Sequence, residues 1–186
     1  MRIVAGEARS RIIDAPKGTD TRPTLDRVRE NLFNILMPRV PSAHVLDLFA
    51  GSGALSLEAL SRGAASAVMV DCDREAQRVE RLNTERLGYQ DRVRLLPCDW
   101  KRAVRLLTEE RAVFDLVFLD PPYAMQDLRE VTRLLLPLLS PNARVINEHA
   151  AERPSTVCVE LVQADRRRWG YAGVTFYRLP SEEERL

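Results

Sequence analysis

Residues 120–123 read Asp-Pro-Pro-Tyr, a combination of side chains that could hold and orient a small reacting group. They follow residues 114–119, in which Val117, Phe118 and Leu119 succeed one another without polar alternation, a pattern that predicts a strand buried on both faces. Proline has no N–H and disfavours helical backbone in the residue before it, so Asp120 would be extended and its neighbours rigid. The structural alternative is a strand terminator followed by a surface turn.

A second candidate stretch is Asp-Leu-Phe-Ala-Gly-Ser-Gly at residues 47–53. Its glycines, Gly51 and Gly53, permit a tight turn after a strand and let the backbone approach a ligand closely. Asp71 lies 20 residues after Gly51. At that spacing an acid at the end of the next strand can accept hydrogen bonds from both hydroxyls of a ribose. The two features together indicate a nucleoside cofactor.

Four predicted strands carry an acid towards the carboxyl end: Asp47 within the first, Asp71 at the end of the second, Asp99 just after the third and Asp120 at the end of the fourth. In an open parallel sheet, ligands bind beyond the carboxyl ends of the strands, so these four acids should share one edge. Asp99 suits the amino group of an adenine ring, which Trp100 would cover. The alternative for Asp99, as for Asp73, is a cap on the following helix.

The choice of cofactor depends on a missing glycine. A dinucleotide fingerprint needs a third glycine where this chain has Ser56, so a pyrophosphate is disfavoured. S-adenosylmethionine carries an adenine, a ribose and an amino acid but no phosphate, which fits a site lined with carboxylates. The predicted cofactor residues are Asp47, Phe49, Ala50, Gly51, Ser52, Gly53, Asp71, Cys72, Asp99 and Trp100. The three cysteines and two histidines lack metal-ligand spacing, so no metal is expected and the thiols should be reduced and mostly buried.

Strand and helix patterns alternate from residue 45 onwards. Strands are expected at 45–49, 66–71, 92–97, 114–120 and 143–149, and helices at 54–63, 73–88, 100–107 and 128–139. This alternation predicts an α/β fold with a mostly parallel sheet covered by helices. Residues 155–163 and 173–179, joined by an arginine-rich link, should add an antiparallel hairpin, which makes a seven-stranded sheet.

The N-terminal segment should be a separate arm. Residues 2–6 and 11–15 resemble a β-hairpin, and a helix should follow with Thr24 as its N-cap. The apolar face of this helix would contain Leu25, Val28, Leu32, Ile35 and Leu36. Basic residues exceed acidic ones by three over residues 1–39, although the whole chain has a formal net charge of only +1. This local excess, like Arg166, Arg167 and Arg168 beside Trp169, is either a nucleic-acid contact or a solvated face.

The composition bounds the class of protein. A length of 186 residues suits one compact unit, and 45% hydrophobic with 30% charged residues is usual for a globular protein. The near-zero net charge excludes a protein that coats nucleic acid indiscriminately. No apolar stretch has membrane-spanning length and the start lacks a signal-peptide core, so we expect a cytoplasmic protein.

The chain resembles a known family across nearly its whole length. The combination of residues 47–53 with Asp-Pro-Pro-Tyr resembles Rossmann-like methyltransferases that modify exocyclic amino groups. Adding Arg-Pro-Thr at 22–24 and the following helix, it resembles the RsmD-type enzymes, which methylate N2 of a guanine in 16S ribosomal RNA. Two positions depart from that pattern, Thr21 and Asn147, where apolar residues would be usual.

This resemblance implies roles for particular residues. Asp120 and the Pro121 carbonyl would accept hydrogens of the target amine, Pro122 would stiffen the loop, and Tyr123 would stack on the base. S-adenosylmethionine would be the methyl donor, and 16S ribosomal RNA, alone or within the small subunit, would be the partner. Residues 1–40 would form an RNA-binding arm and residues 41–186 the methyltransferase domain. The predicted RNA contacts are Arg9, Arg11, Arg22, Thr24 and Arg27.

Three other functions share parts of this pattern. DNA adenine or cytosine amino-methyltransferases usually carry a target-recognition domain, for which 186 residues leave no room. Protein glutamine methyltransferases would need a peptide-binding front in place of an arginine-bearing arm. A cofactor-binding module without catalysis would escort RNA, bind cofactor and show no turnover.

Overall fold

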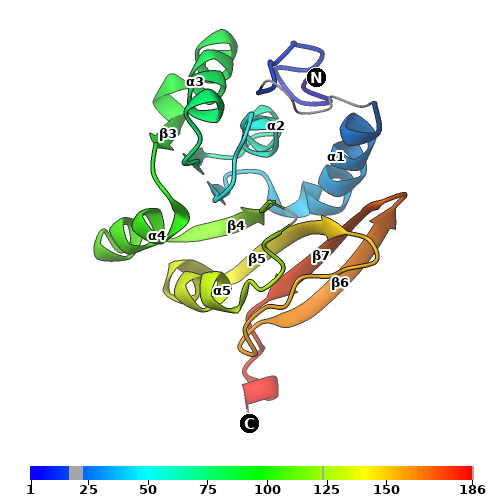
Figure 1. Ribbon diagram of the computed structural model, residues 1–186, viewed down its shortest axis with the longest axis vertical. Helices are drawn as coiled ribbons and strands as arrows, with labels where there is room; N and C mark the ends of the chain where they lie inside the picture. The colour runs from blue at the N-terminus through cyan, green and yellow to red at the C-terminus, as the bar shows by residue number, and fades with distance from the viewer. Residues whose placement is uncertain (17–22, 123, 186) are drawn as a thin grey trace.

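The computed structural model describes residues 1–16, 23–122 and 124–185, which fold into a seven-stranded sheet covered by helices (Figure 1). The strands are β1 His44–Asp47, β2 Ser66–Val70, β3 Val93–Leu96, β4 Phe114–Leu119, β5 Leu139–Ala150, β6 Val162–Trp169 and β7 Ala172–Arg178. The helices are α1 Pro23–Leu36, α2 Ala54–Ser61, α3 Arg74–Leu87, α4 Trp100–Glu109 and α5 Arg129–Leu135.

The strand order is β3-β2-β1-β4-β5-β7-β6. The first five strands pair in parallel, and β7 lies antiparallel between β5 and β6. The order runs outward in opposite directions from β1 and β4, which makes the gap beyond their carboxyl ends the topological switch point. The α/β class, the mostly parallel sheet, its seven strands and the C-terminal antiparallel pair are all confirmed.

Each face of the sheet has its own apolar core. Side chains of β1 alternate between the two cores, with Val45 in one and Leu46 in the other, as strand geometry requires. Val45 packs with Leu32 of α1 and Leu57 of α2, whereas the opposite face packs against α4 and α5. In Figure 1, α1, α2 and α3 accordingly lie on one side of β4 and β5, with α4 and α5 on the other.

Polar side chains fix where two helices begin. Asp73 accepts a hydrogen bond of 2.9 Å from the Ala76 N–H at the start of α3, and Asp99 accepts one of 3.1 Å from the Arg102 N–H at the start of α4. Such caps satisfy N–H groups that have no partner within the helix. Capping is therefore an observed role of both acids.

The N-terminal segment is a short hairpin. One antiparallel bridge joins Arg2 and Ile12, and the Ile3 N–H donates to the Arg11 carbonyl at 3.0 Å. Ile3 and Ile13 are buried in the core on the α1 face of the sheet. The expected pairing of residues 2–6 with 11–15 is thus present, although its ladder is shorter than the sequence pattern predicted.

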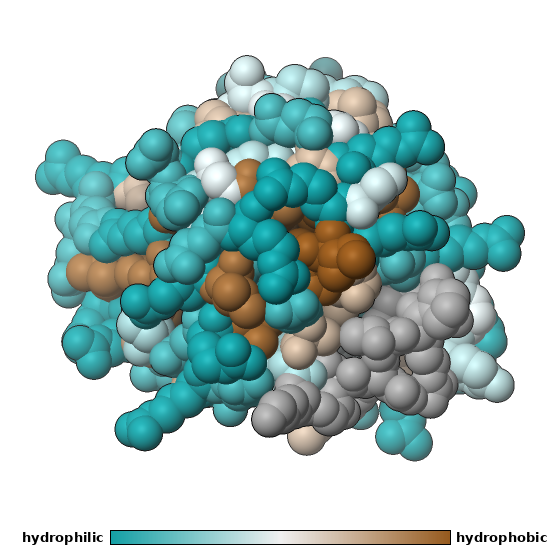
Figure 2. All heavy atoms as spheres, turned by 90° about the horizontal axis from the view of Figure 1, so that it is seen from above, coloured by the Kyte–Doolittle hydropathy of each residue, from teal (hydrophilic) through white to brown (hydrophobic). Residues whose placement is uncertain are grey.

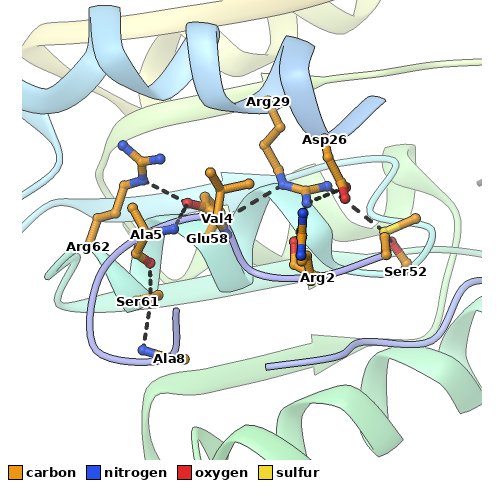
Figure 3. A network of polar contacts seen from close by, with 11 residues as sticks. Arg2, Val4, Ala5, Ala8, Asp26, Arg29, Ser52, Glu58, Ser61 and Arg62 are labelled. Atoms are coloured by element: carbon orange, nitrogen blue, oxygen red, sulfur yellow. Dashed lines mark hydrogen bonds and ion pairs between the residues drawn. The ribbon is translucent and has the colours of Figure 1, made fainter. Parts of the chain in front are cut away.

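Glu58 of α2 holds this arm against the body (Figure 3). Its carboxylate is fully buried and accepts hydrogen bonds from the Val4 N–H at 2.8 Å and the Ala5 N–H at 3.0 Å. Arg62 donates to it at 2.7 Å, and Arg29 of α1 approaches within 3.6 Å. A buried charge requires such compensation, so Glu58 ties the arm, α1 and α2 together.

Two predictions for the first helix need correction. The first helix begins at Pro23, so Thr24 lies within its first turn and does not precede it as the N-cap; proline is well suited to the first helical position. Ile35 is 38% exposed, and Phe33 occupies the core in its place. The buried face of α1 therefore includes position 33 and excludes position 35, because the helical spacing of apolar residues alone did not decide between these two positions.

The C-terminal hairpin also differs from its prediction. Its first strand is β6, Val162–Trp169, so the arginines expected in a link lie within the strand and residues 155–161 precede it. β6 is the edge strand of the sheet, and charged side chains are common at such edges because water solvates them. The first strand therefore lies about seven residues later in the chain than expected.

No helix among residues 1–16, 23–122 and 124–185 is long and apolar enough to cross a membrane.

Candidate active site

Acidic side chains form a row along the carboxyl edge of the parallel sheet. In strand order they are Asp99 after β3, Asp71 after β2, Asp47 at the end of β1, Asp120 after β4 and Glu148 near the end of β5. The first four were predicted, and the structure places their strands side by side as expected. Glu148 was missed, although residues 143–149 had been recognised as a strand with an acid near its end.

A pocket of about 220 Å³ opens at the centre of this edge. Carboxyl groups from three neighbouring strands line it, together with the loop after β1, α1 and the start of the arm. Its lining residues are Met1, Pro16, Val28, Arg29, Leu32, Asp47, Phe49, Ala50, Gly51, Ser52, Ala54, Leu55, Asp120 and Glu148. Six of the predicted site residues, Asp47, Phe49, Ala50, Gly51, Ser52 and Asp120, therefore meet in one cavity. Figure 2, which views the molecule from above Figure 1, shows patches of apolar residues among the polar residues of that face.

Asp47 lies at the floor of the pocket. Its side chain is 1% exposed, and Ser56 donates a hydrogen bond of 3.1 Å to Oδ2. Among the described residues, Oδ1 has no hydrogen-bond partner. Burial, opposed by the Ser56 hydrogen bond and reinforced by Asp120, raises the pKa of Asp47 to about 7. An unpaired buried oxygen facing a pocket calls for a donor or a cation from a ligand.

The glycine turn above Asp47 is fixed by backbone geometry. Gly51 has φ +57°, and a Cβ placed there would meet no atom within 4 Å, so this side of the loop is open. Gly53 has φ +75°, and a Cβ there would approach the Met69 Sδ at 2.9 Å. Both positions favour glycine, the first for the left-handed turn and the second also for close packing on β2.

The side chain of Asn83 in α3 also stabilises this glycine turn. Its side-chain amide donates to the Ser52 carbonyl at 2.9 Å and to the Asp14 carbonyl at 3.0 Å, and its Oδ1 accepts from the Asp14 N–H at 2.8 Å. One buried side chain thus joins the N-terminal arm to the pocket loop. Sequence reasoning did not find this role because Asn83 lies in a polar helix without a motif.

Asp120 stands at the mouth of the pocket and begins the Asp-Pro-Pro turn. Solvent reaches its side chain, yet the protein surrounds the carboxyl group, and this desolvation raises its pKa to about 6. The Pro122 carbonyl accepts a hydrogen bond of 2.8 Å from the Met125 N–H, whereas the Pro121 carbonyl has no partner among the described residues. Asp120 and the Pro121 carbonyl are therefore both available as acceptors. Tyr123 lies outside the described residues.

Arg29 is a further residue that sequence reasoning missed. It is 5% exposed in α1 and lines the pocket. Asp26 accepts from it at 2.8 Å, and its guanidinium lies 3.9 Å from the Met1 Sδ. Positions 28, 29, 32, 33 and 36 are all buried, so a wider helical face would have included it. The arginine predicted as a surface contact, Arg27, is exposed on the other side of the helix.

Glu80 is a further buried carboxyl group close to the site, where it interacts with Asp71 and Asp47. It is 1% exposed in α3, and its Oε1 has no partner among the described residues. Burial, reinforced by Asp71 and Asp47, raises its pKa to about 8. The charge of this region therefore depends on pH near neutrality.

Five predicted cofactor residues lie outside the pocket. Gly53 is buried beneath its loop, Cys72 is exposed after β2, and Asp71 binds the loop backbone. Trp100 has the Lys101 Nζ 5.3 Å from its ring centroid. Asp99 lines a separate groove along α4. The pocket therefore contains only the half of the predicted site nearest β1 and β4.

The predicted RNA contacts are divided between two places. Arg9 is exposed on the arm, and Arg11, also exposed, donates to the Arg86 and Leu87 carbonyls at the end of α3. Arg27 and Thr24 both belong to α1, but the structure does not describe the side chain of Thr24. Arg22 lies outside the described residues altogether.

The thiols and potential metal ligands were also located. Cys158 is buried, Cys98 is half-buried and Cys72 is exposed, and all three are free. Within the described part of the chain no group of three His, Cys, Asp or Glu side chains could hold a metal ion. The site is a carboxyl-rich pocket, suited to a ligand with positive charge or several N–H donors.

Comparisons with known proteins identify the family of this chain. The family model described as "Conserved hypothetical protein 95" matches residues 1–178. YlbH of Bacillus subtilis, a candidate rRNA methyltransferase, is 35% identical over 182 residues, with 96% of this chain and 98% of that protein covered. Ribosomal RNA small subunit methyltransferase D of Escherichia coli K12 is 41% identical over 137 residues, 73% of this chain and 66% of that protein.

Solved structures agree with the sequence comparisons. The candidate methyltransferase yhhF of Escherichia coli superposes with a TM-score of 0.81 at 34% identity, covering 98% of this chain and 99% of that one. The Rossmann-like methyltransferase fold and enzymatic methyl transfer are thereby established. The chain belongs to the family described as conserved hypothetical protein 95, the RsmD family of methyltransferases.

Proposed function

We propose that the protein transfers a methyl group from S-adenosylmethionine to the exocyclic N2 amine of a guanine in 16S ribosomal RNA. The observation that carries this proposal is the position of Asp120, at the carboxyl end of β4 and in one pocket with the glycine loop after β1. An amine acceptor and a cofactor loop must share a cavity for direct transfer. The names of the family relatives supply the RNA substrate.

The pocket fits the amino-acid half of S-adenosylmethionine. That cofactor carries an ammonium group and a sulfonium, and the unpaired Oδ1 of Asp47 offers a buried acceptor for the positive charge. Arg29 and the N-terminus of α2, which begins at Ala54, both lie at this pocket and suit the carboxylate. Gly51 leaves open space above the loop for the cofactor to enter.

The nucleoside half would extend along the strand ends. Asp71 would accept hydrogen bonds from the ribose, and Asp99 with Trp100 would hold the adenine on the far side of β2. Both carboxylates already bind backbone N–H groups, which fixes their orientation while one further lone pair remains for a ligand.

The remaining residues act on the target amine. S-adenosylmethionine supplies an electrophilic methyl group, and the amine nitrogen must reach it in line. The amine is a poor nucleophile because its lone pair is delocalised into the ring. Asp120 and the Pro121 carbonyl accept its hydrogens, favour the pyramidal nitrogen of the transition state and stabilise the positive charge that grows there. The proline backbone keeps both acceptors rigid.

The N-terminal arm and α1 would contact the RNA around the target, with residues 41–186 as the catalytic body. Arg9 and Arg27 are exposed and unpaired among the described residues, so both are available to phosphates. With a ribosomal RNA substrate, the protein would act in the cytoplasm.

The experiment offers radiolabelled S-adenosylmethionine with four substrates: 16S ribosomal RNA, small subunits from cells that lack the enzyme, duplex DNA and a protein extract. Labelling of the RNA or the subunits, with the product identified as N2-methylguanine by mass spectrometry, supports the proposal. Labelling of DNA or protein alone would replace it. The same mass spectrometry maps the modified nucleotide.

A further inference from the structure

Glu148 lies beside Asp120 on the neighbouring strand. In the β4–β5 ladder, Phe118 pairs with Ile146 and Leu119 with Asn147, so the next pair along is Asp120 and Glu148. Side chains two residues apart on a strand share a face. Phe118 and Ile146 both lie in the core on the α1 face, and Asp120 and Glu148 therefore project on that side too. Both carboxyl groups line the pocket.

The carboxyl group of Glu148 is unpaired among the described residues. Within the described residues its side chain makes no hydrogen bond and no ion pair, although other carboxyl groups of the protein are engaged, such as that of Glu58. Its side chain is half-buried, so leaving an acceptor unpaired there has a cost. A half-buried free carboxyl group next to the proposed amine acceptor is a candidate for contact with the substrate.

The edge of guanine offers a second donor next to its amine. Guanine presents N1–H directly beside the N2 amine, whereas adenine and cytosine present a ring nitrogen lone pair beside their amines. If Asp120 and the Pro121 carbonyl accept the amine hydrogens, the next acceptor along the sheet edge faces N1. A base taken out of its RNA context is read by contacts of this kind to its Watson–Crick edge.

We infer that Glu148 is a specificity-determining residue, whose carboxylate accepts N1–H of the target guanine while Asp120 holds the amine. This inference rests on the proposed function and extends it from the reacting atom to the choice of base. Adenine or cytosine at the same place would set a lone pair against a carboxylate, which is repulsive. Selection therefore combines one favourable contact with one unfavourable contact.

The charges around Glu148 fit an acceptor that ionises on binding. Asp120 faces it from β4, Asp47 from β1 and Arg29 from α1, and Arg153 lines the hollow on its other side. Burial, reinforced by Asp120 and opposed by Arg29, raises the pKa of Glu148 to about 8 in the free protein. An N–H donor and a cationic cofactor both favour the ionised form, so binding the guanine should release a proton.

The test compares guanine with 2-aminopurine, which keeps the 2-amino group but has no hydrogen at N1. Small subunits are reconstituted with 16S ribosomal RNA ligated to carry either base at the mapped position, and kcat/KM is measured for each. The variant Glu148→Gln presents an amide that can donate as well as accept, so it tolerates both bases. Glu148→Asp retains the charge, and Glu160→Gln removes an exposed carboxylate near Arg133 as the matched control.

The wild-type enzyme and Glu160→Gln should prefer guanine, and Glu148→Gln should lower that preference at least about tenfold, the usual effect of a hydrogen bond to a charged group. 2-Aminopurine also lacks the O6 oxygen of guanine. Because the preference of each variant is divided by that of the wild type, the effect of this missing oxygen cancels. Glu148→Asp should keep the preference at a reduced rate. Binding of S-adenosylmethionine, measured by calorimetry, verifies folding.

Two results would overturn the inference. In the first, Glu148→Gln binds cofactor and keeps the wild-type preference. In the second, it loses activity equally on both bases, which would make Glu148 a general part of the catalytic machinery. If the wild-type enzyme methylates neither base, the proposed function itself is wrong, so the two failures are separable.

Discussion

The backbone N–H of Gly51 donates a hydrogen bond of 2.9 Å to Oδ2 of Asp71. This contact joins the glycine turn after β1 to the acid after β2. Oδ1 of Asp71 accepts from the Asp73 N–H at 2.9 Å, so each carboxylate oxygen is oriented by a backbone group. The acid predicted to bind ribose is therefore preorganised by the loop that approaches the cofactor.

Replacing Asp71 by alanine should weaken binding of S-adenosylmethionine by about 1 to 3 kcal/mol, the range for hydrogen bonds to a charged group. Asp73→Ala serves as the control, since it removes the cap of α3 and should lower stability by about 1 kcal/mol with little change in cofactor affinity. Calorimetric titration of both variants measures the difference. Equal affinity of Asp71→Ala and the wild type would remove the ribose assignment.

Glu58 should hold the arm in place over the pocket. Glu58→Gln keeps one acceptor but loses the charge that compensates Arg62 and Arg29, and should destabilise the protein by about 3 kcal/mol, as for a broken buried ion pair. Hydrogen exchange at the Val4 and Ala5 amides, whose partner is Glu58, should accelerate more than exchange in the central strands. Uniform acceleration would mean that the arm is not separately anchored.

Stability should fall as pH rises towards 8. Burial raises the pKa of Asp47 to about 7 and that of Glu80 to about 8. Between the unfolded pKa values near 4 and these folded values, the folded state holds protons that the unfolded chain has lost. Raising the pH therefore favours unfolding across that window, and the effect is complete above about pH 8.

Glu80→Gln should flatten this profile, because it removes one of the carboxyl groups that titrate in this window. The difference between variant and wild type should reach about 1 to 3 kcal/mol at pH 8.5 and shrink towards pH 5. Urea unfolding at a series of pH values measures it. Parallel profiles for the two proteins would show that Glu80 is ionised in the fold.

Arg27 should contribute to RNA binding through its exposed charge. Arg27→Ala should lower RNA affinity and reduce the slope of log K against log salt by about one unit, since one phosphate contact is lost. Arg39 is also exposed but precedes β1 at the opposite edge of the sheet, so Arg39→Ala is the matched control. Cofactor binding should be unchanged in both. An unaltered salt slope in Arg27→Ala would leave α1 without a role in RNA binding.

The sequence predicted what depends on local pattern. The strand and helix order and the acids at four strand ends follow from periodicity and residue type, and the helix caps at Asp73 and Asp99 had been weighed as the alternative role of these two acids. Glu148 could have been found by the same rule, since β5 carries an acid near its end as the neighbouring strands do. It was missed because the motif at 120–123 already explained the chemistry.

What sequence could not supply depends on contacts between distant segments. The burial of Arg29 and Glu58 results from the arm folding over α1 and α2, and nothing in either helix alone marks a buried charge. The position of β6 depends on which segment completes the sheet edge. There the run of Arg166, Arg167 and Arg168 resembled a link because charges are rare in central strands but tolerated at edges.

Asp120 tests the central claim most directly, because two possible roles of its carboxylate respond differently to substitution. As a positioned acceptor it needs only an oxygen, so Asp120→Asn should keep measurable activity with the amide oxygen turned to the amine. Asp120→Ala should lose about 10² to 10³ in kcat, as when one preorganised contact to a developing charge is removed. Cofactor affinity should barely change in either variant, since the defect lies in the transition state.

The decisive measurement is single-turnover methyl transfer from radiolabelled S-adenosylmethionine to the RNA substrate by the wild type, Asp120→Asn and Asp120→Ala, each checked for cofactor binding. We predict the order wild type, then Asn, then Ala. An Asn variant as inactive as the Ala variant would indicate a general base. An Ala variant with the wild-type rate would contradict the assignment of Asp-Pro-Pro-Tyr as the catalytic site.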